Sequence, residues 1–202
     1  MFTGIISKTS KVKNIKQKDG SFVVEIQNNL GKIKLGQSIS INGVCSTVKK
    51  TGKSISFEYM PESLKLSNMG SLRKGDIVNM EQSVRMSDRL DGHIVLGHID
   101  DKGEILDIKE EGNSRVLTIK VPARNATHNV AGGPVREFMR LLVYKGSIAV
   151  EGISLTVAKV LRNSFVVKII PYTLGHTNLK YKEKGDFVNL EFDILAKYAN
   201  KK

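Results

Sequence analysis

The sequence predicts an all-β protein, made of two tandem antiparallel barrels followed by a short C-terminal helix. Two observations carry this prediction. The chain of 202 residues contains one unit twice, and each copy consists of short segments rich in Val and Ile that are separated by Gly, Asn, Asp and Lys. Many short strands at this spacing favour a closed barrel, because closure leaves no exposed strand edge.

The repeat is defined by three landmarks that occur in the same order in both halves. Matching positions are Gly4, Val12 and Ile15 with Gly97, Ile105 and Ile108, then 39–48 with 148–157, and 74–81 with 184–191. A period of roughly 90–110 residues is the size of a domain rather than of a solenoid repeat. We therefore expect one barrel at 1–93, a second at 94–191 and a terminal helix at 192–202, with a duplicated site for two similar ligands.

The strands are expected where apolar residues alternate or cluster between turn residues. Asn42-Gly43 is a strong hairpin signal, and Pro61 and Pro171 each follow a strand, where we expect an extended exit and a turn. The predicted strands are 22–26, 38–41, 45–49, 54–59 and 76–80 in the first half, and 116–121, 147–150, 155–160, 165–170 and 186–192 in the second.

Two regions depart from the strand pattern. The second half carries extra residues near 123–142, which we interpret as a surface loop at 123–134 and a short helix at 135–142. At the end of the chain, Asp193 is suited to cap a helix that has Ile194, Leu195 and Tyr198 on one face. So short a helix is not stable alone and needs a barrel or another subunit to pack against.

Composition limits the classes of function. The net charge is +12, but the lysines are scattered, arginine-rich runs and Trp are absent, and aromatic residues are few, so we do not expect nucleic-acid binding. No apolar stretch is long enough to span a membrane and the N-terminus lacks the plan of a signal peptide. Cys45 is the single cysteine and excludes an internal disulfide. These features favour a cytoplasmic protein.

Matched polar residues are the first candidates for ligand contacts. Cys45 and Ser154 occupy equivalent positions, and either alone would be interpreted as a small residue buried in a strand. His98 matches Ile5, so the halves are chemically unequal at this point. His93 and His98 are five residues apart, which on a strand places them on opposite faces, so we expect no metal site.

These motifs, taken together, are similar to the alpha-type riboflavin synthase family. The matching segments span nearly the whole chain, at 1–6, 42–48, 60–63, 92–98, 145–157 and 170–174. The resemblance implies two six-stranded Greek-key barrels related by pseudo-symmetry and a C-terminal helix that assembles a homotrimer. It leaves open a complex with lumazine synthase.

The resemblance also implies a reaction. Two molecules of 6,7-dimethyl-8-ribityllumazine exchange a four-carbon unit, giving riboflavin and 5-amino-6-ribitylamino-uracil in the last step of riboflavin biosynthesis, and no metal or redox cofactor is needed. Each site forms where the N-terminal barrel of one subunit meets the C-terminal barrel of another. His98 is expected to handle the proton of the acidic C7 methyl group, while Ser154, Thr156 and Cys45 orient the rings or stabilise an adduct at C7.

Binding residues are assigned by position. The first lumazine would contact Gly4, Ile5, Ile6, Cys45, Ser46, Thr47, Glu58, Met60, Pro61, Glu62 and Ser63. The second would contact Gly97, His98, Ile99, Lys145, Ser154, Leu155, Thr156, Ile170, Pro171, Tyr172, Thr173, Leu174 and Gly175.

Departures from the family pattern concern single side chains. Ser46 stands where Leu is usual, Glu151 where Asp is usual, Ser63 where Thr is usual, and Leu96 where a small residue is usual. The alternative function is a non-catalytic lumazine- or flavin-binding optical protein. Such proteins resemble this family but have a degraded second half, whereas this chain keeps Gly97-His98 and 154–156.

Overall fold

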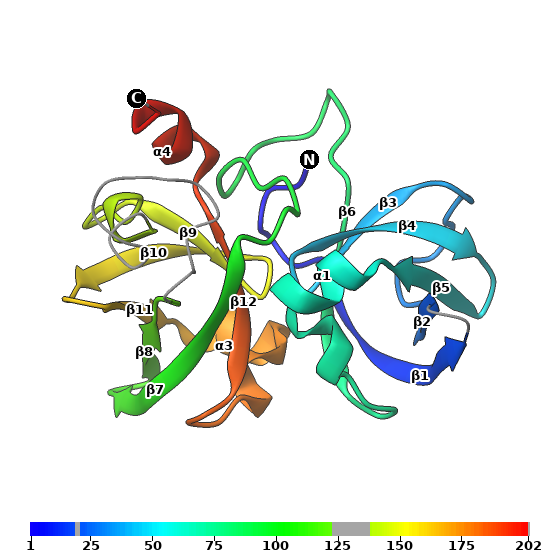
Figure 1. Ribbon diagram of the computed structural model, residues 1–202, viewed down its shortest axis with the longest axis horizontal. Coiled ribbons are helices and arrows are strands. Elements are labelled where there is room, and N and C mark those ends of the chain that lie inside the picture. The colour runs from blue at the N-terminus through cyan, green and yellow to red at the C-terminus, as the bar shows by residue number, and fades with distance from the viewer. Residues whose placement is uncertain (19–20, 123–137, 202) are drawn as a thin grey trace.

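Two closed six-stranded barrels lie side by side in the computed structural model, which describes residues 1–18, 21–122 and 138–201 (Figure 1). The first barrel is formed by the blue-to-cyan half of the chain and the second by the green-to-orange half. The predicted all-β fold with two barrels and a C-terminal helix is confirmed.

The first barrel has the strand order β1-β2-β5-β4-β3-β6, and β6 closes it against β1. Strands β3, β4 and β5 follow one another as antiparallel neighbours, and β6 returns to pair with β3, which is a Greek key. The elements are β1 Lys8–Lys18, β2 Ser21–Gln27, β3 Ser38–Ile41, β4 Val44–Lys50, β5 Ser54–Tyr59, α1 Pro61–Leu66, the 3-10 helix η1 Asn68–Ser71 and β6 Ile77–Gln82.

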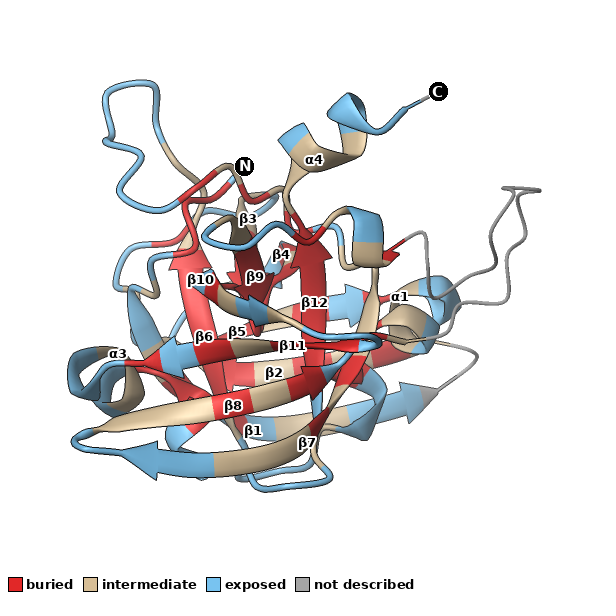
Figure 2. Ribbon diagram, turned by 90° about the vertical axis from the view of Figure 1, so that its left-hand side faces the viewer, coloured by how far each residue is buried: buried red, intermediate tan, exposed pale blue. Residues whose placement is uncertain are grey.

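The second barrel repeats the same connections in the order β7-β8-β11-β10-β9-β12. Each barrel encloses its own apolar core, and the inward-facing residues are the buried ones in Figure 2. The elements are β7 Asp101–Glu111, β8 Ser114–Lys120, β9 Ser147–Val150, β10 Ile153–Val160, β11 Ser164–Ile169, α3 Pro171–His176, the 3-10 helix η2 Asn178–Tyr181, β12 Phe187–Phe192 and α4 Ile194–Ala199.

The first strand of each barrel was not predicted from the residue pattern. Strands β1 and β7 each contain 11 residues and are the longest in the fold. Their register shifts at a bulge after Val12 and after Ile105, so the apolar positions Val12 and Ile15 do not keep the two-residue period of a regular strand. The bulges therefore hid both strands from a periodicity argument.

The two proline segments also differ from the expectation. Pro61 and Pro171 begin the short helices α1 and α3 rather than simple turns. Proline is favoured at the first helical position, because its missing N–H would have no helical partner there. Elsewhere, the predicted loop at 123–134 lies outside the described residues, and of the predicted helix at 135–142 the residues 138–140 are helical.

Buried polar side chains join the two barrels. Glu151 is fully buried and accepts hydrogen bonds from the side chains of Asn68 and Asn178 at 2.6 and 2.7 Å. Asn79 and Asn189 complete the network, and every described buried polar side chain has a partner. Glu151 thus stabilises the seam between the barrels.

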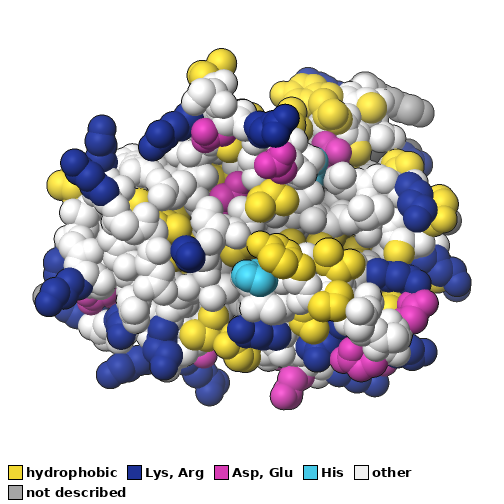
Figure 3. All heavy atoms as spheres, turned by 180° about the vertical axis from the view of Figure 1, so that it is seen from behind, with side chains coloured by type: hydrophobic (Ala, Val, Ile, Leu, Met, Phe, Trp, Pro, Cys, Tyr) yellow, Lys and Arg dark blue, Asp and Glu magenta, His cyan; other side chains and the backbone are white. Residues whose placement is uncertain are grey.

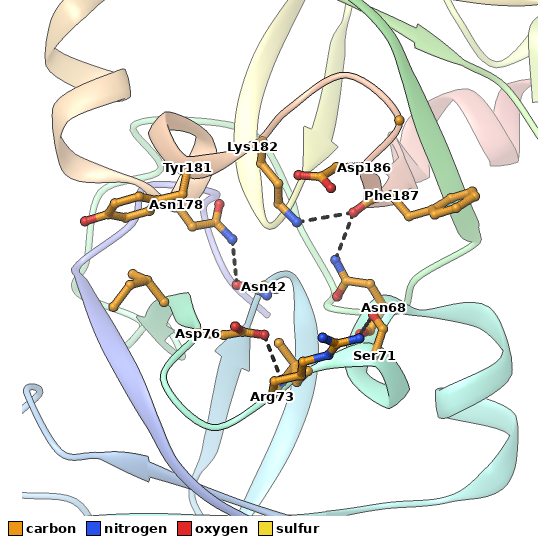
Figure 4. A pocket seen from close by; sticks show the side chains of 13 residues that line it. Asn42, Asn68, Ser71, Arg73, Asp76, Asn178, Tyr181, Lys182, Asp186 and Phe187 are labelled. Atoms are coloured by element: carbon orange, nitrogen blue, oxygen red, sulfur yellow. Dashed lines mark hydrogen bonds between the residues drawn. The ribbon is translucent and has the colours of Figure 1, made fainter.

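A cavity of about 460 Å³ opens onto this seam (Figure 4). Lys182 reaches into it and donates to the carbonyl of Phe187, while the backbone of Arg73 donates to Asp76. None of the residues assigned to lumazine lines this cavity. Three of its lining residues, Asn42, Asn68 and Asn178, belong to the hydrogen-bonded network that joins the barrels.

The C-terminal helix α4 projects from the second barrel (Figures 1 and 2). Asp193 caps it as predicted, since its carboxylate accepts the backbone N–H of Leu195 at 2.9 Å. Leu195 and Tyr198 are 65% and 69% exposed. None of the described helices has both the length and the apolar character that crossing a membrane would require.

Candidate active site

Two extended segments cross at the centre of the molecule, the first arm at 1–7 and the second arm at 92–100. Each arm carries a glycine whose carbonyl accepts a hydrogen bond from a strand of the opposite barrel. The carbonyl of Gly4 accepts from the backbone of Ser154 on β10, and that of Gly97 accepts from the backbone of Cys45 on β4, both at 2.8 Å. The repeated residues therefore form two equivalent contacts, one on each barrel.

These contacts require glycine for two reasons. Gly4 and Gly97 have φ of +78° and +80°, which other residues rarely adopt. In addition, a Cβ on Gly4 would lie 2.7 Å from the backbone nitrogen of Ser154, and one on Gly97 would lie 2.8 Å from that of Cys45. The arms can approach the strands this closely only without a side chain.

A buried carboxylate holds each arm in place. Glu81 on β6 accepts the backbone N–H groups of Thr3 and Gly4 at 2.6 and 3.0 Å. Glu191 on β12 accepts those of Leu96, Gly97 and His98 at 2.7, 2.8 and 3.1 Å. The two glutamates are equivalent in the repeat, so the same device fixes both arms.

Burial changes the proton affinity of both carboxyl groups. It raises the pKa of Glu191 to about 7, an increase that the N–H groups of Leu96 and Gly97 oppose. Burial also raises the pKa of Glu81, against the opposing effect of the hydrogen bonds from Thr3. Burial therefore favours the protonated form of both carboxyl groups, while the N–H groups of the arms favour the charged form.

The first arm, β10 and α3 enclose a cavity of about 580 Å³. Ser154 lies on its wall, and Thr156 is on the same outward face of β10, two residues along. The ring of Tyr172 stacks on that of His176 at 4.1 Å, and Nδ1 of His176 hydrogen-bonds the carbonyl of Tyr172 at 2.7 Å. The lining residues are Gly4, Ile5, Ile6, Ser7, Lys8, Thr9, Ile153, Ser154, Tyr172, Thr173, Gly175, His176 and Thr177.

A second imidazole lies beneath this wall. Nδ1 of His93 is 2.7 Å from Oγ of Ser154, and the backbone N–H of His93 donates to the carbonyl of Thr3 at 3.1 Å. The side chain is buried. Residues 92–94 do not form a strand, so the strand argument that placed His93 and His98 on opposite faces does not apply. The two side chains nevertheless differ in exposure, because His93 is buried and His98 is exposed.

The equivalent position on the first barrel is chemically different. Cys45 contacts a small buried cluster of Phe2, Val95 and Ala149. His98 follows the Gly97 contact, where the first arm has Ile5. One site therefore combines a thiol with an exposed imidazole, and the other combines a hydroxyl, a buried imidazole and an aliphatic side chain.

Alternation along the strands separates the predicted contact residues. On β4, Cys45 and Thr47 face outward whereas Ser46 is buried, and the Ser46 hydroxyl lies 2.9 Å from that of Tyr59, whose pKa burial raises. On β10, Leu155 is likewise buried. Ser46 and Leu155 can therefore reach a ligand only through their backbone atoms.

The structure also regroups the predicted residues. The first arm residues Gly4, Ile5 and Ile6 lie beside Ser154 and the start of α3, not beside Cys45 as the division by halves implies. Ile99 of the second arm packs against the first barrel's core. The arms cross to the opposite barrel, and a comparison of the two halves does not reveal that crossing.

The remaining predicted residues lie at the strand ends. Lys145 is in the turn before β9, with its Nζ 5.3 Å from the centre of the Tyr144 ring, and does not line the 580 Å³ cavity. Glu58 is the residue before the last of β5 and forms an ion pair with Lys49. The residues around the first turns of α1 and α3 are Met60, Pro61, Glu62 and Ser63, and Ile170, Pro171, Tyr172, Thr173, Leu174 and Gly175.

Three groups were given no role in the ligand site from the sequence, and His93 was considered only as a metal ligand. Glu81 and Glu191 were within the matched segments 74–81 and 184–191, so their repetition was the available signal. The indication that His93 belongs to the site was weaker, because a histidine between a glycine and apolar residues is not a distinctive pattern. Only the path of the second arm brings it to Ser154.

Basic side chains are dispersed over the face of the molecule that Figure 3 shows. Lys and Arg lie at many separate places on this face, and a histidine lies among hydrophobic side chains near its centre. Several lysines pair with acidic neighbours, as Lys168 does with Glu111 and Lys197 with Asp100 at 2.6 and 2.7 Å. This face has no continuous basic stripe of the kind that tracks a nucleic-acid backbone.

Comparison with known proteins identifies the family. The model of the lumazine binding domain matches residues 3–83 and 96–193. The riboflavin synthase of Actinobacillus pleuropneumoniae is 40% identical over 98% of this chain and 87% of its own length, and that of Escherichia coli K12 is 37% identical over 96% and 87%. The structure of LumP complexed with 6,7-dimethyl-8-(1'-D-ribityl) lumazine has the same fold, with a TM-score of 0.80 and 22% identity over 95% of this chain and 98% of that one. The chain therefore belongs to the riboflavin synthase family of transferases.

Proposed function

We propose that the chain converts two molecules of 6,7-dimethyl-8-ribityllumazine into riboflavin and 5-amino-6-ribitylamino-uracil by transfer of a four-carbon unit. The observation that carries this proposal is the pair of equivalent contacts, Gly4 with Ser154 and Gly97 with Cys45. Two similar ligands need two similar cradles. Because one ligand must donate carbon atoms and the other must accept them, the two binding sites also need to differ. The side chains beside the two glycines do differ.

The chemistry begins with loss of a proton from the C7 methyl group, whose anion the ring delocalises. His98 is the proposed proton acceptor, because it is exposed at the Gly97 contact and its backbone is fixed by Glu191. A positioned base is typically worth about 10²–10⁴-fold in rate. Cys45, Ser154 and Thr156 orient the two rings or stabilise an adduct at C7.

Holding the two lumazine rings in contact contributes a further large part of the rate enhancement. Well-oriented groups react as if at effective molarities of about 10⁵ M or more. Exposed backbone groups at the starts of α1 and α3 are suited to bind the uracil-like edge of each lumazine. The residues proposed for binding are those named from the sequence, but the arms exchange partners. Gly4, Ile5 and Ile6 join the site of Ser154, and Gly97, His98 and Ile99 join the site of Cys45. Ser46 and Leu155 contribute backbone atoms only.

The two partners in transfer are proposed to sit on different subunits. Within one chain the two glycine contacts lie on separate barrels, so a complete reaction site pairs the first barrel of one subunit with the second barrel of another. The exposed face of α4, with Leu195 and Tyr198, is the proposed trimer contact. The boundaries 1–93, 94–191 and 192–202 and the cytoplasmic location remain predictions, as does a complex with lumazine synthase.

A turnover assay tests this function. The purified chain is mixed with the lumazine, and riboflavin is followed by its absorbance while substrate loss is measured by chromatography. We expect one riboflavin for each two lumazines consumed. Tight binding without product would instead support the optical-protein alternative, and occupation of one site per chain at saturation would contradict the paired-cradle mechanism.

A further inference from the structure

We propose that His93 is a positioning residue that fixes the hydroxyl of Ser154 for the transfer reaction, an inference that rests on the function proposed above. The observation is the 2.7 Å hydrogen bond between Nδ1 of His93 and Oγ of Ser154. Ser154 lines the 580 Å³ cavity, and His93 does not. His93 therefore acts through Ser154 rather than on the ligand.

The backbone that carries the imidazole is fixed against the first arm. The backbone N–H of His93 donates to the carbonyl of Thr3, and the neighbouring Gly92 packs so closely that an added Cβ would lie 2.1 Å from that same carbonyl. Thr3 in turn is fixed by Glu81 at 2.6 Å. The ring thus has a defined place between the first arm and β10, which a freely rotating surface histidine lacks.

The protonation state of His93 decides the direction of its hydrogen bond with Ser154. Burial lowers the pKa of His93, and Asp193 opposes this effect, so the ring is neutral at neutral pH. A neutral imidazole has one acceptor nitrogen and one N–H donor. We assign the proton of the neutral ring to Nε2, so that Nδ1 accepts the hydrogen of the Ser154 hydroxyl. The oxygen lone pairs of Ser154 are then free to accept a hydrogen bond from the ligand in the cavity.

This arrangement makes the twin sites unequal. Cys45, the equivalent of Ser154, contacts the apolar cluster of Phe2, Val95 and Ala149 and not an imidazole. A thiol is also a weak hydrogen-bond acceptor, whereas an oriented hydroxyl is a good one. The ligand beside Ser154 is therefore held in a defined orientation by a fixed acceptor that the ligand beside Cys45 lacks.

The test compares variants that keep or remove this hydrogen bond. In His93→Leu the side chain keeps a similar volume but cannot bond Ser154, whereas in His93→Asn a polar atom remains near the place of Nδ1. We expect His93→Leu to lower kcat about 10²-fold, as expected when a reacting group is misplaced, with lumazine Kd changed less than about threefold. His93→Asn should recover most of the lost rate.

A double-mutant cycle shows whether the effect passes through Ser154. If it does, the variant His93→Leu/Ser154→Ala is no slower than Ser154→Ala alone. Independent, multiplicative losses would overturn the positioning role, and so would a His93→Leu variant with wild-type kcat.

A spectroscopic measurement covers the case in which His93→Leu does not fold. The ¹⁵N chemical shift of His93 Nδ1 in the full chain should move in Ser154→Ala and stay unchanged in Thr156→Ala. An unmoved shift in Ser154→Ala would overturn the contact. A wild-type chain that makes no riboflavin overturns the proposed function and this role with it, whereas active wild type with an equally active His93→Leu overturns only the role of His93.

Discussion

Phe2 and Val95 occupy equivalent positions in the repeat, 93 residues apart, and they hydrogen-bond to each other. The backbone N–H of Phe2 donates to the carbonyl of Val95 at 2.6 Å, and that of Val95 donates to the carbonyl of Phe2 at 3.1 Å. Both side chains are fully buried. A reciprocal bond between equivalent residues marks the pseudo-two-fold axis, and the two arms cross at this point.

The close approach of each arm predicts a loss of activity when its glycine gains a side chain. We expect Gly4→Ala and Gly97→Ala to lower turnover by about 10²-fold or more, because the arm must move away from Ser154 or Cys45. Gly31→Ala is the matched control, since Gly31 has a φ of +80° but no atom lies within 4 Å of the place that an added Cβ would take. It carries the backbone strain, of order 1–3 kcal/mol, without the clash. Equal losses of turnover in all three variants would show that strain alone, not the contact, is responsible.

The polar seam predicts that the barrels depend on each other for stability. Asn79 donates to the Asn178 side chain at 2.8 Å and accepts from its backbone at 2.7 Å, so Asn79→Ala leaves buried partners unsatisfied. We expect a loss of about 2–4 kcal/mol in the free energy of unfolding, measured in urea. Asn163→Ala, at an exposed turn, is the control and should change stability by less than about 0.5 kcal/mol. A stable Asn79→Ala variant would show that the seam is not a determinant of stability.

The raised pKa of Glu191 predicts a pH-dependent stability. Between the ordinary carboxyl pKa of 4.5 and the folded value of about 7, the folded chain binds a proton that the unfolded chain does not. This contribution is therefore complete below pH 4.5 and is lost as pH rises through 7, amounting to about 3 kcal/mol. Glu81 contributes with the same sign.

Urea unfolding between pH 4.5 and 8 measures this effect. The decline in stability should be smaller in Glu191→Gln than in wild type, and it should be unchanged in Glu183→Gln, which removes an exposed carboxylate. Parallel profiles for wild type and Glu191→Gln would contradict a protonated Glu191 in the folded chain.

The proposed role of His98 predicts a separation of rate from binding. We expect His98→Gln to lower kcat by about 10²-fold or more while the lumazine Kd changes by a few-fold at most, because a base acts in the transition state. Single-turnover kinetics and fluorescence titration supply the two quantities. Equal losses in rate and affinity would reject proton transfer by His98.

The exposed face of α4 predicts an assembly role. A chain ending at Asp193 should sediment as a monomer and lose most of its activity, because a complete site is proposed to need two subunits. The double variant Leu195→Ser/Tyr198→Ser, which keeps the helix but removes its apolar face, should behave in the same way. An active trimer formed by either protein would contradict this role of α4.

Much of the fold follows from local pattern, and the site follows only in part. The matched segments 39–48 and 148–157 predicted β3 with β4 and β9 with β10, because alternation and the Asn42-Gly43 turn are local signals. The bulged strands β1 and β7 lack that alternation. The crossing of the arms is a tertiary relationship. The match of Gly4 with Gly97 therefore identified both contact residues, but it did not indicate which barrel each glycine contacts.

The crossed arms also bear on how a two-part chain of this kind could arise. If one half were made as a separate polypeptide, the carbonyl of its arm glycine would have no strand of a second barrel to accept a hydrogen bond from. The strand of its own barrel that normally bonds the other arm would also lack a partner. Two such polypeptides could repair both defects only by trading their leading peptides across a dyad. Gene fusion would then have joined, in a single chain, two barrels that already exchanged their arms in an ancestral dimer.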